Sequence, residues 1–230
     1  MAGHRCTRTL EVNEVEGLLS PSQPQRPLNH ATRVGVSAVG VLCGLAGMEH
    51  GVGEVLQGNV ATSGMVINAW QPSSPLFGEE PAVTIIPNVL ATGILAIIVG
   101  LLVTAWSVAF VQRKNGGIVL LLLSILQFFV GGGIAPLIPA IAAGVAATRI
   151  NSPLTWWRAH LPVKAGRVLA KLWVWSLIAF SFLYSSLLLS RFFYGTNVEL
   201  ALNLGDLTLG LIFLTFFAGF AYDIQRRTAE

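Results

Sequence analysis

Residues 118–148 read IVLLLLSILQFFVGGGIAPLIPAIAAGVAAT, and this apolar stretch decides the architecture. As a single helix its 31 residues would be about 46 Å long, whereas the hydrocarbon core of a bilayer is about 30 Å thick. Gly131, Gly132, Gly133 and Pro136 stand in its middle and are typical of a turn. We therefore expect two short helices, at about 118–131 and 135–148, joined by a tight turn.

Both flanks of this stretch are basic. Arg113 and Lys114 precede it, and Arg149 with four further Lys or Arg residues follows it before residue 172. Because Lys and Arg concentrate in cytoplasmic loops, both flanks are expected on the cytoplasmic side, so the chain must go out and return. Two full spans are the favoured interpretation. The alternative is a re-entrant hairpin whose glycine turn lines a cavity, since non-helical backbone at membrane depth must be buried in protein or face water.

Four other apolar runs are long enough to cross a bilayer, and they cover residues of about 34–56, 83–111, 172–189 and 200–222. Together with the two short helices they predict an all-α fold, a polytopic helical membrane bundle of six transmembrane helices with a tight hairpin between the third and the fourth. The transmembrane domain then covers residues 34–222. It lies between a flexible cytoplasmic tail at 1–33 and a short cytoplasmic tail at 223–230.

The distribution of charge agrees with this topology. Only 11% of the residues are charged and 53% are hydrophobic, whereas about a quarter of the residues of an average soluble domain are charged. Of the 14 Lys and Arg residues, Arg191 alone falls on the outer side. The net charge of +3 is thus explained by orientation in the membrane rather than by nucleic acid. We expect a multi-pass protein of the cell (inner or plasma) membrane, with both termini cytoplasmic and the lipid bilayer as its partner.

Small residues recur along the first predicted span. Gly40, Gly44, Gly47 and Gly51 follow one another at spacings of four, three and four. Such spacings let helix backbones approach closely, which stabilises helix pairs in lipid. We expect this face to pack within the bundle, and a homo-oligomer interface is the alternative.

The outer end of the same span is unusually polar. His50, Glu54 and Gln57 are spaced i, i+4 and i+7, so that on a helix they form one stripe, with Glu49 beside it. Ionisable groups in a membrane span are costly and usually face protein or a watery cavity. Two other spans carry polar residues near their outer ends. The expected outer pocket contains Glu49, His50, Glu54, Gln57, Asn88, Asn203 and Asp206.

Three functions are compatible with such a pocket. The leading hypothesis is a small transporter, channel or binding protein that uses the pocket for a substrate or ion. The first alternative is a structural or partner-binding membrane protein without a chemical site. The second is a metal-dependent membrane-embedded enzyme, with His50 and Glu54 as ligands and Asp206 completing the site. The spans hold no H-E-x-x-H motif and one histidine, so an enzyme is the less favoured class, and the sequence names no cofactor.

Overall fold

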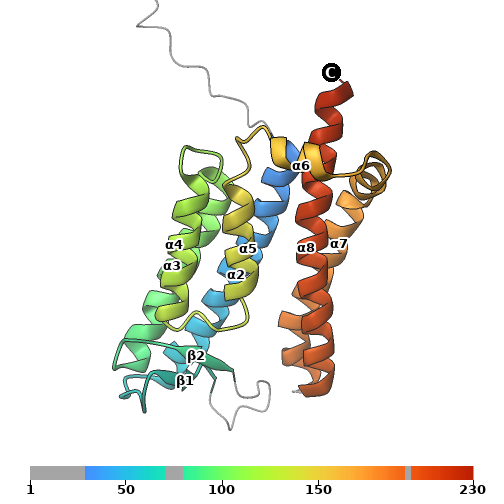
Figure 1. Ribbon diagram of the computed structural model, residues 1–230. Coiled ribbons are helices and arrows are strands. Elements are labelled where there is room, and N and C mark those ends of the chain that lie inside the picture. The colour runs from blue at the N-terminus through green and yellow to red at the C-terminus, as the bar shows by residue number, and fades with distance from the viewer. Residues whose placement is uncertain (1–28, 71–79, 195–197, 230) are drawn as a thin grey trace, which may run out of the picture.

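The computed structural model describes residues 29–70, 80–194 and 198–229, and in them the chain forms a bundle of helices with a small two-stranded sheet at one end (Figure 1). The elements in chain order are α2 (His30–Gln57), β1 (Val66–Asn68), β2 (Pro81–Val83), α3 (Val89–Ala109), α4 (Gly116–Phe129), α5 (Leu137–Ala147), α6 (Thr155–His160), α7 (Val163–Tyr194) and α8 (Val198–Ala229). Most of the predicted tail, residues 1–28, lies outside the described residues, and α2 begins at His30, four residues before the predicted span.

The bundle has two chemically different ends (Figure 1). At one end lie the α3–α4 connection, α6 and the C-terminal end of α8, and we call it the basic end because Arg113, Lys114, Arg149 and Arg158 belong to these connections. At the other end lie β1, β2 and the α4–α5 turn, and we call it the capped end. Arg191 stands in the last turn of α7, away from the basic end.

Within the described residues, four helices are long and apolar enough to cross a membrane: α2, α3, residues 163–189 of α7 and residues 203–228 of α8. The helices α4 and α5 are also apolar but have only 14 and 11 residues. Large apolar side chains are exposed along these helices, among them Leu101, Leu122 and Phe182. In water such a surface would be unfavourable, whereas lipid accommodates it. The chain is thus a helical protein with the character of a membrane-embedded bundle.

The helices α2 and α3 pack with almost no side chain between them. A methyl group at Gly44 would lie 2.7 Å from the carbonyl oxygen of Gly100, and one at Gly93 would lie 2.6 Å from the carbonyl oxygen of Gly51. Contacts this short are available only to glycine, so the small-residue face of α2 packs within the chain, as the spacing predicted.

The α4–α5 connection contains the three glycines. Gly131 and Gly133 have φ angles of +93° and +84°, a region that L side chains rarely adopt. The chain leaves α4 at Phe129 and enters α5 at Leu137, and the two helices lie side by side with this connection at the capped end (Figure 1).

The capped end is closed by the short β1–β2 sheet, which the sequence analysis did not predict. The strands are antiparallel, with Val66 opposite Val83. The backbone of Gly131 donates a hydrogen bond to the carbonyl of Val83 at 3.0 Å, so the sheet is joined to the glycine turn. Gln57 donates from its side-chain amide to the carbonyls of Asn68 and Ala69, at 2.9 and 2.7 Å. The sheet therefore forms a cap that is hydrogen-bonded to both α2 and the turn.

At the basic end, α8 holds the start of α2. The buried carboxylate of Asp223 accepts hydrogen bonds from the backbone N–H groups of Ala31 and Thr32, both at 2.9 Å, and from the Thr32 hydroxyl at 2.7 Å. The first N–H groups of a helix have no partner within the helix, and a carboxylate there also interacts favourably with the helix dipole. The α7–α8 pair is thus fixed to the rest of the bundle through Asp223.

Candidate metal centre

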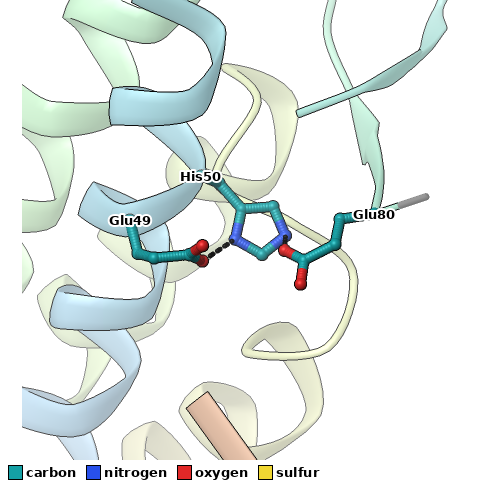
Figure 2. Close-up of side chains that lie close together, drawn as sticks. All are labelled: Glu49, His50 and Glu80. Carbon is teal, nitrogen blue, oxygen red and sulfur yellow. Dashed lines mark ion pairs between the residues drawn. The ribbon is translucent and has the colours of Figure 1, made fainter. Parts of the chain in front are cut away.

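A histidine between two carboxylates lies below the cap (Figure 2). His50 and Glu49 are neighbours on α2, and Glu80 immediately precedes β2. The Nδ1 atom of His50 lies 3.2 Å from a Glu49 oxygen, and the Nε2 atom lies 3.2 Å from Oε2 of Glu80. The side chains of His50 and Glu80 are only 4% and 3% exposed, and that of Glu49 is 18% exposed, so the cluster is almost closed to solvent.

The surroundings of His50 assign its two ring nitrogens different roles. Nδ1 lies 3.0 Å from the carbonyl oxygen of Ala46, which can only accept a hydrogen bond, so Nδ1 carries the proton. In the tautomer with the proton on Nδ1, Nε2 on the Glu80 side is the ring nitrogen that could offer a lone pair to a metal ion. Histidine ligands of metals typically donate their second ring N–H to a backbone carbonyl or a carboxylate in this manner.

Glu49 is held in place by the cap. One of its oxygens accepts a hydrogen bond from the indole nitrogen of Trp70 at 2.8 Å, and Trp70 directly follows the segment that Gln57 fixes. The other oxygen lies beside Nδ1 of His50. Glu49 can therefore orient the imidazole from its Nδ1 side, whereas Glu80 lies on the Nε2 side (Figure 2).

The glycine turn covers this cluster closely. A methyl group at Gly133 would lie 2.5 to 2.7 Å from three atoms of the His50 ring, and one at Gly131 would collide with both carboxylate oxygens of Glu54. Glycine is required at both positions for two reasons. The backbone has positive φ angles, and the buried polar side chains of α2 leave no room for a Cβ atom.

Glu54 is a second buried acid beneath the same turn. Its side chain has no exposed surface, and neither carboxylate oxygen has a hydrogen-bond partner among the described residues. Burial of an unpaired polar group is unfavourable by several kcal/mol, and such groups in folded proteins usually mark an ion, a water molecule or a chemical role. Glu54 thus places a buried acid, without a hydrogen-bond partner among the described residues, under the turn that also covers His50.

The donor set fits a divalent cation. Each of Glu49, His50 and Glu80 offers one ligand atom, and these atoms lie within 4.8 Å of one another. In a tetrahedral site with bonds of about 2.1 Å the ligands are about 3.4 Å apart, so no pair of these atoms would have to move together by more than about 1.4 Å. Imidazole nitrogen combined with carboxylate oxygen suits first-row transition metals and Zn²⁺.

The residues expected in the outer pocket fall into three groups. Glu49 and His50 come together, with Glu54 under the same turn. Gln57 and Asn88 have structural contacts: Gln57 holds the cap, and Asn88 accepts from the backbone of Ala91 at the start of α3.

The third group is on α8. Asn203 and Asp206 are exposed there, and Asp206 is not among the acids that cluster with His50. Glu80 was missed by the sequence analysis. Its one signal in the sequence is an acidic residue between the predicted spans 34–56 and 83–111, in a segment that contains no Lys or Arg.

Comparison with protein-family models, with curated proteins and with solved structures gives no match to this chain. Its function must be inferred from the site.

Proposed function

We propose that this chain is an integral membrane protein of the binding or transport type that takes up a divalent transition-metal cation at its capped end. The supporting observation is that Nε2 of His50 and the carboxylate of Glu80 lie 3.2 Å apart in an almost closed site. A metal ion bound between these two atoms would be held by two coordination bonds.

The closure of the site favours an ion over an organic substrate. The three ligand side chains are 3 to 18% exposed, and the glycine turn and the cap lie directly over them. A dehydrated metal ion fits among these groups without a cavity, whereas a substrate that reacts at the metal would need one beside it. Binding or passage of the ion is therefore a better match than metal-dependent catalysis.

The excess of acid supports a cation over a simple ion pair. Glu49 and Glu80 flank one imidazole, and Glu54 lies under the neighbouring glycine of the same turn. A doubly protonated His50 would supply a single positive charge against the two carboxylates that flank it. Charged groups in a membrane span are retained when they are paired or have a function, and a divalent ion would balance this cluster.

The topology of the proposal has six crossings with both termini in the cytoplasm of a cell membrane. In it, α4 and α5 are two short spans, and the basic end faces the cytoplasm because Lys and Arg residues remain there. The capped end then faces outward and presents the metal site to the external solution. The gathering of Arg113, Arg149 and Arg158 at one end supports this orientation.

The test is metal binding by the purified full chain in detergent, measured by zinc competition with a chromophoric chelator. Wild type should bind one Zn²⁺ per chain, and His50→Ala and Glu80→Gln should each weaken binding by about tenfold or more, since both remove a ligand. Asp206→Asn is the matched control, because this acid is exposed on α8, and it should bind as wild type does. If wild type and His50→Ala bind Zn²⁺ equally, the cluster is an ion pair that stabilises the fold, and the proposal fails.

A further inference from the structure

An apolar groove of about 430 Å³ runs between α5 and α8. Ile138 and Val145 line its α5 side, and Phe213 and Phe220 line its α8 side. Arg149, which follows α5, stands at the end of the groove that belongs to the basic end. The groove is therefore apolar along its length and cationic at one end.

The groove is about as long as the acyl chain of a phospholipid, which spans half of the hydrocarbon core of a bilayer. From Ile138 to Arg149 the chain advances eleven residues, or about 16 Å at the helical rise of 1.5 Å per residue. Half of the hydrocarbon thickness is about 15 Å. An acyl chain lying in the groove would thus place its headgroup beside Arg149.

The guanidinium of Arg149 is available for such a headgroup. Arg149 is exposed, and no ion pair of its side chain is found among the described residues. Its backbone carbonyl accepts a hydrogen bond from the side chain of Asn29, so the position of the residue is fixed while its side chain is not. Trp157 lies beside it and packs on Phe217 and Phe220, with ring centroids 5.2 and 5.4 Å apart. Tryptophan is enriched at the level of lipid headgroups.

We infer that an anionic phospholipid occupies this groove, with one acyl chain between α5 and α8 and its phosphate at Arg149. An acyl chain is thinner and more flexible than a helix of a second copy, which with its side chains is about 10 Å wide, and it can lie between two helices that also contact each other. The positive charge at the headgroup end selects an anionic lipid over a zwitterionic one.

The experiment compares phosphatidylglycerol with phosphatidylcholine on the purified full chain, by native mass spectrometry of lipid adducts in detergent. Wild type should prefer phosphatidylglycerol about fivefold, the effect expected of one basic residue near the headgroup. Arg149→Gln should remove this preference. Arg113→Gln is the matched control, since Arg113 is also exposed at the basic end but does not line the groove, and it should keep the preference.

Two further arms locate the acyl chain. Ala142→Phe places a ring in the groove and should weaken binding of both lipids, while its helical circular dichroism and melting temperature in detergent report whether the bundle is intact. Glycerol phosphate, which has the headgroup phosphate but no chains, should not compete. Equal binding of the two lipids by wild type, equal losses in Arg113→Gln and Arg149→Gln, or full competition by glycerol phosphate would each overturn the inference. So would a wild-type dimer that Ala142→Phe dissociates, because the groove would then hold a second copy.

Discussion

Replacement of Gly44 by alanine tests how closely α2 and α3 pack. The added methyl group would lie 2.7 Å from the carbonyl oxygen of Gly100 and 3.0 Å from the backbone nitrogen of Thr104, and it would collide with the Thr104 hydroxyl. The hydroxyl can rotate away, but the two backbone atoms can move only if the helices separate. Overpacking of this kind typically lowers the free energy of unfolding by about 1 to 3 kcal/mol.

A second glycine isolates this packing term. Alanine also stabilises a helix relative to glycine by up to about 1 kcal/mol, which would hide part of the loss. Gly210 on α8 has open space where a side chain would be, so Gly210→Ala should change the free energy of unfolding only through the higher helix propensity of alanine. The difference between the two variants in the free energy of unfolding should therefore be about 1 to 3 kcal/mol.

The assay is reversible unfolding in mixed micelles, with the denaturing detergent increased stepwise and the helical signal followed by circular dichroism. Gly44→Leu should be still less stable, since it adds three more carbon atoms at the same contact. If Gly44→Ala and Gly210→Ala have the same free energy of unfolding, this face of α2 is not in close contact with α3, and the proposed packing is wrong.

Three other predictions use the same preparations. Asp223→Ala should lower the free energy of unfolding by about 2 kcal/mol, because three hydrogen bonds at the start of α2 lose their acceptor, and unchanged stability in the micelle titration would contradict this role. Gly133→Ala should weaken zinc binding about tenfold or more, because the added methyl group displaces the His50 ring. Gly64→Ala is the control, since Gly64 faces open space, and it should bind zinc as wild type does. Equal zinc affinities of the two variants would show that the turn does not constrain the site. A cysteine at position 160 should resist labelling from outside intact cells, and strong labelling there would refute the cytoplasmic placement of the basic end.

The general architecture could be predicted because it depends on local properties of the sequence. Long apolar runs produce helices wherever backbone groups must be satisfied within the segment, and four such helices are present. The triple glycine was identified as a turn for the same reason, since its backbone preferences are intrinsic to the residues. The number of membrane crossings and the orientation of the chain depend in addition on the membrane, and both are part of the proposed function.

The missing half of the candidate site depends on long-range contacts. Glu80 is thirty residues from His50 and reaches it only because the three-residue strands β1 and β2 pair and bind the glycine turn. Strands this short leave no periodicity to detect. Gly131 and Gly133 were predicted to reverse the chain, with a turn that lines a cavity as the alternative, and their close contacts with Glu54 and His50 were not foreseen.

The rotation of a helix about its axis also limits what a sequence can predict. Asp206 and Asn203 were grouped with His50 because they lie at a similar depth along neighbouring spans, but depth alone does not determine which face a residue occupies. On α8 both are exposed. The role of Asp223 was hidden for a related reason, because it falls where the last span was expected to end and its partner, the start of α2, is 191 residues away.

The most direct test of the metal centre is X-ray absorption spectroscopy of the zinc-loaded protein. The fine structure should show nitrogen and oxygen ligands at about 2.0 to 2.2 Å, with the outer-shell signal of one imidazole ring. That imidazole signal should disappear in His50→Ala and persist in Asp206→Asn. A spectrum of a hydrated ion without imidazole, or one that is the same in wild type and in His50→Ala, would show that His50 and Glu80 do not bind the metal.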